Sequence, residues 1–600
     1  MSARVRRKRA ALRAAAVLTG PVALLACTFA LGAAPEQPSA DILARQRAQF
    51  DADAPKTILD LQPFRTETRI PIRATSGAAG TATLINLNPQ AGSWYLLSLE
   101  WAISGKQAQY HLEVPRPQAL RLLSADPGTL RLVGTDGVSC TLLIDIKRGT
   151  LNEAAASDLP YAPLCEGALY VRNTVTGHAT SLERATDFLR DHVWGGERVI
   201  TFAKDKLYRD AFLERATLDA GRGAAPERAS PLTPLVPALA PQSAGRSIPV
   251  EHLGLDLATS TSELDPGQWY AVRDLPAVSV SVIAPEFIDA RFRFGREVTV
   301  NPLDPVESVA LVYLVAFDLE LLNFHYVMGT QHPRLDWSER PPASSRDPRL
   351  AGPDGVGSAA PLVTNGMISP ADADQTIAAF AAGFKRSHGA FHYGLLSLRN
   401  HGSHYGFIEQ GVVFSKLQPG LASLLIMDDG AVDLRTWSAA DESQLSRIRD
   451  ARQNGVPLIE YDPVNRKGVP GSLVNLWGPG NWSGSAGEDL RSLRAGLCLQ
   501  ENGTHRYLIY GYFSAATPSA MARVFQAYQC RYAMHLDMNA LEHTYLALYI
   551  RRKGQRVVEH LIDEMQVVDR SSKRGELAPR FLGFPDDRDF FYVTRHGASP

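Results

Sequence analysis

A polar cluster near the end of the chain contains the residue types that acid–base chemistry requires. His535, Asp537, Glu542 and His543 fall within nine residues, with Asn539 between them, and apolar sequence flanks the group on both sides. Alternate side chains of a β-strand point the same way, so His535 and Asp537 would share one face. An imidazole and a carboxylate that face one hollow can exchange protons with a substrate. The alternative is a buried structural hydrogen bond between the two groups.

Cationic side chains that could hold an anion come from two other parts of the chain. Arg491 stands at the start of an expected strand, with Arg494 as the alternative, and Lys385 lies in a loop bounded by glycines. Arginine suits bidentate contacts to anionic oxygens. His388, a catalytic candidate, and His392 lie in or beside the same loop and could close over the site. The alternative is that these residues are surface charges and ordinary loop histidines.

A divalent metal is a competing interpretation of the polar cluster. His535, Asp537, Glu542 and His543 could present nitrogen and oxygen ligands to such an ion. They lack the pair of ligands four residues apart on a helix that many metal motifs use. We therefore expect no cofactor, with this metal site as the weaker alternative.

The elements that must position the cluster are predicted from turn and periodicity signals. A strand is expected at 491–500, a turn at 501–503 and a returning strand at 506–513. Thr517 and Pro518 then start a helix, which leads into the strand that carries the cluster. Its apolar stripe at helical spacing consists of Met521, Val524, Phe525 and Tyr528. This order predicts an α+β domain with a mixed sheet.

The whole chain divides into four predicted parts. Residues 35–220 read as a β-rich, sandwich-like N-terminal domain with closing helices, because short alternating strands are separated by turns. One closing helix has a capping box at Thr180 and Glu183, and its expected core stripe is Leu182, Ala185, Phe188 and Leu189. Residues 221–247 form a linker rich in proline and alanine, and residues 248–600 form the α+β domain.

The first 34 residues have the pattern of an export signal. A basic cluster at 4–9 precedes an apolar run from 14 to 34, which is typical of a signal peptide and also long enough for a membrane anchor. The sequence around Cys27 also resembles a lipoprotein cleavage site. We expect an exported protein, whether periplasmic, secreted or attached to a membrane through this segment.

Export changes the interpretation of the remaining four cysteines. Cys140 lies near Cys165 and Cys498 lies near Cys530, so two intradomain disulfides are the natural pairing in an oxidising compartment. The alternative is four buried free thiols. The formal net charge of -1 gives no electrostatic footprint for nucleic acid, so nucleic-acid partners are not expected.

From about Val306 to its end, the chain resembles the phosphodiester glycosidase family, in a bacterial branch. That family includes the uncovering enzyme that acts on N-acetylglucosamine-1-phosphodiesters. The resemblance is carried by the alanine- and phenylalanine-rich run 378–384, by Arg491-Ser492 before a strand and hairpin, and by a helix followed by Leu536-Asp537.

The resemblance implies hydrolysis of a glycosidic bond to a phosphodiester, in a glycoconjugate or a cell-envelope polysaccharide. Asp537 would be the acid, base or nucleophile, with His535 or Glu542 as its partner. Arg491 and Lys385 would hold the phosphate, and Arg494 and Asn539 would bind substrate. Ala381, Met538 and Asn539 depart from the family pattern, which has asparagine and glycines there. A catalytically inactive envelope protein that binds glycan is therefore the alternative.

Overall fold

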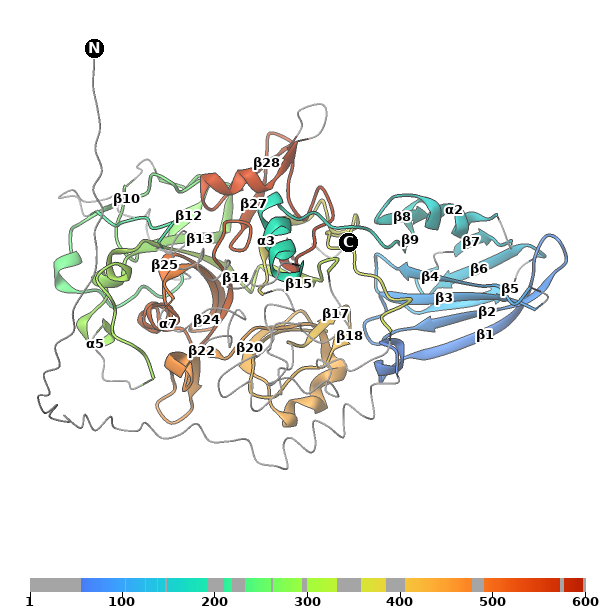
Figure 1. Cartoon of the computed structure of the whole chain (residues 1–600), viewed down its shortest axis with the longest axis horizontal. Helices are drawn as coiled ribbons and strands as arrows, with labels where there is room; N and C mark the ends of the chain where they lie inside the picture. Colours follow the sequence, from blue (N-terminus) through green and yellow to red (C-terminus); the bar gives the residue numbers. More distant parts are fainter. Residues whose placement is uncertain are drawn as a thin grey trace, which may run out of the picture. The chain divides into compact units, whose positions relative to one another are not determined.

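The computed structural model describes residues 56–596 except 103, 125, 138, 146–147, 193–209, 218–232, 260–262, 294–298, 332–357, 385–404, 477–489 and 572–576. Its N-terminal part contains a six-stranded antiparallel sheet (Figure 1). In spatial order the strands are β1 (Thr66–Arg73), β2 (Ala79–Asn86), β3 (Trp94–Trp101), β4 (Gln107–Glu113), β9 (Leu169–Arg172) and β8 (Tyr161–Leu164). A three-stranded sheet, β5 (Leu120–Ser124), β6 (Thr129–Gly134) and β7 (Ser139–Leu143), shares its buried core. The β-rich prediction is confirmed.

Both predicted disulfides are present. Cys140 of β7 is bonded to Cys165, with 5.6 Å between their Cα atoms, and Cys498 is bonded to Cys530. Disulfides persist in oxidising compartments, so these bonds are consistent with an exported protein. Within the described ranges, we find no helix with the length and apolar character that crossing a bilayer requires.

The closing helix α3 (Ser181–His192) differs from its predicted packing. Phe188 and Leu189 were expected in the core, but they are 59% and 36% exposed. Buried contact is made at the start of the helix instead, where the Glu183 side chain is only 4% exposed. The Thr180 hydroxyl accepts a hydrogen bond from the Glu183 amide at 3.1 Å, as an N-cap does. The helix is therefore anchored by polar contacts at its first turn. A second helix of this part is α2 (Thr150–Ala156).

The described half of the proline-rich linker, from 233 to 247, lies against the C-terminal part. Leu235 donates its amide to Gln500 at 2.7 Å and accepts a hydrogen bond from the Trp269 indole at 3.0 Å. Ala240 and Ser247 are buried. This stretch thus runs along the domain that follows it and contains a short 3-10 helix at Pro241–Ser243.

The C-terminal part contains three larger sheets. An eight-stranded sheet has the order β12 (Tyr270–Val272), β13 (Leu275–Ile283), β14 (Val312–Asp318), β25 (His505–Ala516), β24 (Ser492–Asn502), β26 (Tyr532–Met538), β22 (Pro457–Asp462) and β23 (Lys467–Pro470). A five-stranded sheet has the order β15 (Leu322–Val327), β31 (Phe590–Arg595), β16 (Thr376–Ala381), β27 (Leu546–Arg552) and β28 (Gln555–His560). The third has the order β18 (Val412–Ser415), β17 (Phe407–Glu409), β21 (Ile448–Gln453), β19 (Ala422–Met427) and β20 (Val432–Thr436). Two-strand pairs are β10 (Ile248–Pro249) with β11 (Glu263–Leu264), and β29 (Arg570–Ser571) with β30 (Leu577–Ala578).

The prediction of a mixed sheet is wrong for the described chain. Every pairing between its named strands is antiparallel, including β24 with β25 and β24 with β26. The helix α7 (Pro518–Ala527) does connect two strands that run the same way, β25 and β26. They are not neighbours, because β24 lies between them. The α+β class holds, with antiparallel sheets.

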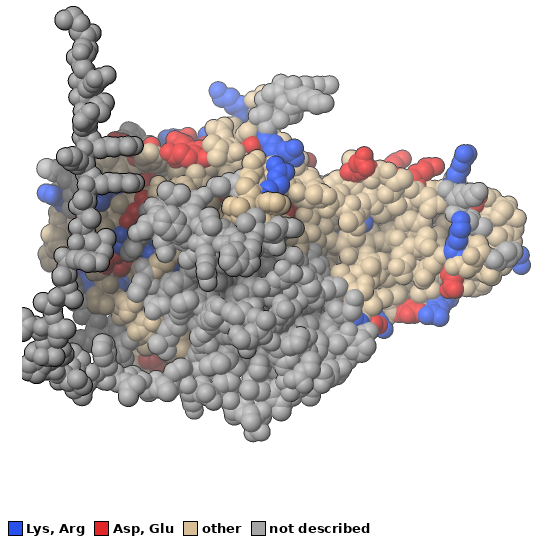
Figure 2. Space-filling view, viewed as in Figure 1, with Lys and Arg blue, Asp and Glu red and all other residues tan. Residues whose placement is uncertain are grey.

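Helix α7 packs closely on the eight-stranded sheet because the sheet presents two glycines opposite each other, Gly496 and Gly511. A Cβ atom at Gly496 would lie 2.8 Å from the Met521 side chain, and one at Gly511 would lie 3.1 Å from Phe525. Thr517 caps the helix, with Pro518 at its first position, as predicted. Another helix is α5 (Ala290–Arg293). On the face in Figure 2, the described charged side chains of both signs are interspersed.

Candidate functional site

Strand β26 carries the two residues on which the sequence prediction centred. It lies between β24 and β22, and all seven of its residues are buried. His535 is 0% exposed and Asp537 is 3% exposed. In the described chain Asp537 hydrogen-bonds to neither His535 nor Glu542. Its Oδ1 accepts from the Met538 amide at 2.8 Å, and its Oδ2 accepts from Arg588 Nη1 at 2.5 Å.

Arg588 links the strand to helix α3. Its Nε donates to Glu183 Oε1 at 2.8 Å while its Nη1 donates to Asp537, and the guanidinium is 1% exposed. Burial alone would lower the pKa of Arg588, but the Glu183 and Asp537 carboxylates raise it. One buried cation therefore holds two acids, and it fixes the orientation of Asp537. Sequence reasoning did not identify Arg588 or this role of Glu183.

Glu542 lies beyond the end of β26 and also contacts the start of helix α3. The Thr180 hydroxyl donates to Glu542 Oε1 at 3.2 Å, and Arg580 donates to the Glu542 carbonyl. Burial alone would raise the pKa of Glu542, but His543, its own backbone amide, Arg580 and Arg588 together lower it. Glu542 is therefore ionised at neutral pH. It is poorly suited to act as a general acid.

His535 faces a cation and an aromatic ring. Its Nε2 lies 3.4 Å from Arg494 Nη1, and its ring centroid lies 5.1 Å from that of Phe384. Burial and then the nearby Arg494 charge lower the pKa of His535 well below its usual value, so the imidazole is neutral. Phe384 is the last described residue before Lys385, His388 and His392, which lie outside the described residues.

Arg494 is a fully buried cation that donates mainly to backbone carbonyls of the described chain. Its Nε donates to the Ala516 carbonyl and its Nη2 to the Leu490 carbonyl, both at 2.8 Å, and it forms no ion pair with a described residue. Burial lowers its pKa to about 9, partly opposed by the charge of Glu307. It therefore stays charged at neutral pH. A buried charge that forms no ion pair is unfavourable, so the position suits an anionic ligand.

Arg491, the preferred arginine in the sequence prediction, is already neutralised by two acids. Its Nε and Nη2 donate to the two Asp210 oxygens, each at 2.6 Å, and its Nη1 contacts Asp304. These carboxylates occupy the guanidinium nitrogens of Arg491 that would otherwise bind a phosphate. Of the two candidate arginines, Arg494 is therefore the one that is not paired with a carboxylate of the described residues.

The turn after β26 orients a third group, His543. Asn539 has a φ of 79°, a left-handed conformation, and this lets the chain turn back on itself. His543 Nδ1 then donates to the Met538 carbonyl at 2.7 Å. In the neutral ring Nε2 must accept, and this atom has no hydrogen-bond partner among the described residues. The same holds for Asn539 Oδ1. His543 is thus oriented as a proton acceptor, a role that the sequence prediction missed.

The metal interpretation finds no support in this geometry. Among the described residues, no three His, Cys, Asp or Glu side chains lie close enough together to hold a metal ion. His535, Asp537, Glu542 and His543 contact Arg494, Arg588, the Thr180 hydroxyl and the Met538 carbonyl respectively.

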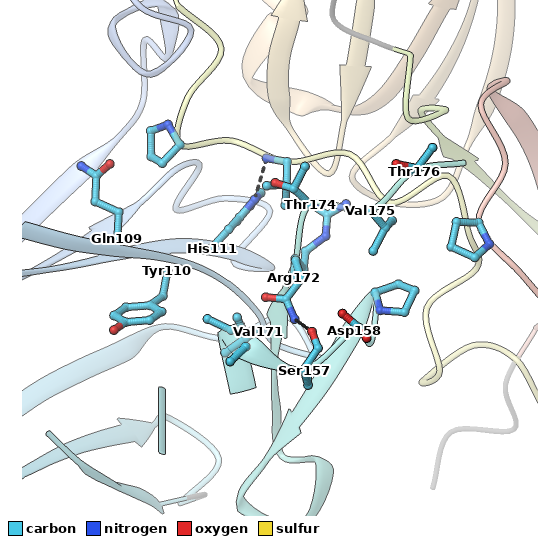
Figure 3. Close-up of a pocket in the computed structure, with 17 residues that line it drawn as sticks. Gln109, Tyr110, His111, Ser157, Asp158, Val171, Arg172, Thr174, Val175 and Thr176 are labelled. Carbon is cyan, nitrogen blue, oxygen red and sulfur yellow. Dashed lines mark hydrogen bonds between the residues drawn. The ribbon is translucent and has the colours of Figure 1, made fainter. Parts of the chain in front are cut away.

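A cavity of about 720 Å³ lies beside β4 and β9 (Figure 3). His111 on its wall accepts a hydrogen bond from the Val363 amide at 3.2 Å, drawn as a dashed line. Asp158 is the single acid among its lining residues, and none of the predicted site residues lines it. The cavity therefore lacks the paired titratable groups that glycoside hydrolysis requires.

No protein-family model matches the chain, and no curated protein matches its sequence. The sequence features behind the family resemblance nevertheless lie near one another in the fold. Phe384 and Arg494 both approach His535, two residues before Asp537. Gly383 permits this approach, because a Cβ atom there would lie 2.9 Å from Asn454 Oδ1.

Proposed function

We propose that this protein is an exported hydrolase that cleaves a glycosidic bond to a phosphodiester, in a glycoconjugate or a cell-envelope polysaccharide. The observation that carries the proposal is Arg494, a buried guanidinium beside His535 that forms no ion pair with a described residue. A phosphodiester would supply the missing negative charge. The residues around the end of β26 would then act on the adjoining sugar.

The roles of the side chains follow from their contacts. Arg494 would stabilise the phosphate as it leaves, and a phosphate departs as an anion without needing a proton. His543 Nε2 would take the proton of the attacking water, because Nδ1 is held by the Met538 carbonyl. Arg494 Nη1 lies 3.4 Å from the Met538 sulfur. Arg494 and His543 therefore both contact Met538. Asp537, held in place by Arg588, would stabilise positive charge on the sugar ring.

The first test is hydrolysis of a sugar-1-phosphodiester by the purified full chain. We expect turnover by the wild type and a loss of about 100-fold in kcat for Asp537→Asn, the scale of removing one electrostatic contact in an active site. Arg494→Met should lose a similar factor in kcat/KM. Glu501→Gln, in the β24–β25 hairpin where Arg531 contacts it, is the matched control and should keep full activity. Equal activity of Asp537→Asn and wild type would refute the assigned site.

A second candidate function is glycan binding without catalysis. The deep burial of His535 and Asp537 favours it, because a catalytic acid has to reach its substrate. Under this alternative the wild type would show no turnover above background while polysaccharide binding was retained. The same assay, run alongside a glycan-binding measurement, separates the two functions.

A further inference from the structure

The cavity beside β4 and β9 has walls from both parts of the chain (Figure 3). Strand β4, the end of helix α2 and the segment after β9 contribute from the N-terminal part, and Pro361, Val363 and Pro585 contribute from the C-terminal part. Its volume of about 720 Å³ lies within the range of small-molecule sites. The hydrolytic step proposed above uses none of its lining residues.

The described walls of this cavity offer a ligand no accessible cation. Arg172 is the single lysine or arginine among the lining residues, and its side chain is 0% exposed. Its guanidinium lies 3.7 Å from the centroid of the Trp94 ring and 3.4 Å from Glu113. Burial and then the Arg172 charge lower the pKa of His111 well below its usual value, so the imidazole is neutral. These contacts disfavour an anionic ligand such as a nucleotide or a phosphorylated sugar.

Uncharged hydrogen-bonding groups line the same walls. Amide and hydroxyl side chains come from Gln109, Ser157, Asn173, Thr174 and Thr176. Gln109 and the two threonines are exposed, and their side chains form no hydrogen bond with a described residue. A hydroxyl group both donates and accepts, and a carboxamide has one acceptor oxygen and an NH2 donor group. These side chains match a neutral ligand that is rich in hydroxyl groups.

The main chain after β9 adds unpaired groups to this wall. The amides of residues 174–176 donate to no described residue. The amides on either side are both bonded. Asn173 donates to the Pro160 carbonyl at 3.1 Å, and Gly177 donates to the Thr330 hydroxyl at 2.9 Å. Residues 174–176 lie outside every described strand, and a peptide that adds to a sheet needs an exposed strand edge. The wall therefore suits sugar hydroxyls better than a peptide.

The cavity lies a short way along the chain from the groups of the proposed catalytic site. Pro585 on its wall is three residues before Arg588, which donates to Asp537. On the other wall, Thr176 is four residues before Thr180, which contacts the turn after β26. Four residues in extended form span at most about 14 Å. An oligosaccharide can extend over that distance.

We propose that this cavity binds neutral sugar units of a glycan chain, through the hydroxyls of Thr174 and Thr176, the Gln109 carboxamide and the neighbouring main-chain amides. It would hold sugars remote from the bond to be cleaved while the phosphodiester contacts Arg494. This extension to the catalytic site rests on the proposed hydrolase function, and the sugar binding itself does not. The substrate class is then a glycan of several sugars instead of a single sugar with a phosphodiester.

Calorimetric titrations of the purified full chain test the sugar binding without any turnover. The probes are three neutral trisaccharides, namely maltotriose, cellotriose and N,N′,N″-triacetylchitotriose, and the anionic trisaccharide trigalacturonate. We expect at least one neutral probe to bind at least tenfold more tightly than trigalacturonate. Binding of none of the three, or equal binding of trigalacturonate, would overturn the proposal. Tighter binding of a blocked pentapeptide of alternating threonine and valine would also overturn it, in favour of a peptide groove.

The double variant Thr174→Val/Thr176→Val assigns the binding to this cavity. It removes two hydroxyls with little change in side-chain shape, so we expect trisaccharide binding to weaken about tenfold, as the loss of two neutral hydrogen bonds would produce. Thr66→Val/Thr68→Val makes the same change at two exposed positions of β1 and should bind like wild type. Equal binding by Thr174→Val/Thr176→Val and wild type would contradict the assignment.

The extension to the catalytic site has its own readout. Wild type should have a KM at least tenfold lower for a sugar-1-phosphodiester that carries two further neutral sugars than for the form with one sugar. Thr174→Val/Thr176→Val should remove this difference. Equal KM values in wild type would overturn the extension. Absence of turnover on both substrates, with trisaccharide binding retained, would instead refute the hydrolase function and support glycan binding without catalysis.

Discussion

Replacing Arg588 with methionine is expected to lower the free energy of unfolding by about 3–5 kcal/mol, the cost of breaking a buried ion pair by removing one partner. The guanidinium is 1% exposed and contacts both Glu183 and Asp537, so its removal takes the shared cation from two buried carboxylates. The midpoint of urea unfolding, followed by circular dichroism, measures the change.

Arg531→Met is the matched control for this prediction. Arg531 also pairs with an acid, Glu501, at 2.7 Å, but the two side chains are 42% and 38% exposed. Solvent-exposed ion pairs contribute little, so we expect a change below about 1 kcal/mol. Similar urea midpoints for the two variants would show that the contacts of Arg588 do not hold helix α3 and β26 together.

Removing the Cys498–Cys530 disulfide is the second change with a large expected effect. The two cysteines are 32 residues apart in sequence, and a cross-link closing a loop of that length stabilises the folded state by about 4 kcal/mol through the entropy of the unfolded chain. Both sulfurs are fully buried, so the double variant Cys498→Ala/Cys530→Ala also loses packing between the end of helix α7 and β24. We expect its urea midpoint to fall accordingly.

Alkylation provides the control for the disulfide prediction. In unreduced, denatured wild type, none of Cys140, Cys165, Cys498 and Cys530 should react, because all four are bonded in pairs. In the double variant Cys140 and Cys165 should remain protected. Labelling of Cys498 in the wild type, or an unchanged midpoint in the double variant, would contradict the expected stabilisation.

Local sequence signals predicted the elements around the site well. Asn502 and Gly503 mark the hairpin turn between β24 and β25, and Gly503 has a φ of 62° as such turns require. Thr517 and Pro518 mark the start of α7, and the cysteine spacing predicted its disulfide to β24. The turn and the start of the helix depend on the conformation of a few neighbouring residues, so the sequence alone predicts them.

The choice between Arg491 and Arg494 could not be made in the same way. Strand β24 has register shifts between Ser492 and Arg494 and again between Arg494 and Gly496. Each shift breaks the alternation that assigns side chains to faces. The sequence shows the arginines but not the bulges, so it could not show that Arg491 pairs with Asp210 while Arg494 approaches His535.

The ionic contacts of Asp537 could not be predicted from the sequence, because the residues involved lie far apart along the chain. Arg588 lies 51 residues after Asp537. The other acid that Arg588 contacts, Glu183, lies 405 residues before Arg588. The apolar stripe of α3 also predicted a core helix, whereas the buried contacts of its described side chains are polar. Pairing over such separations depends on how the sheets assemble, which no local pattern encodes.

The contact between Glu183 and Arg588 has a consequence for how this protein can be divided. A C-terminal fragment produced by itself, from residue 248 onwards, would keep Asp537 and Arg588 but lose the acid that shares the guanidinium. It would also lose Thr180, which donates a hydrogen bond to Glu542. The N-terminal region therefore contributes contacts to the proposed site. A truncation within the proline-rich stretch would separate Glu183 from Arg588 and Thr180 from Glu542. The two regions therefore have to be produced and folded as one chain.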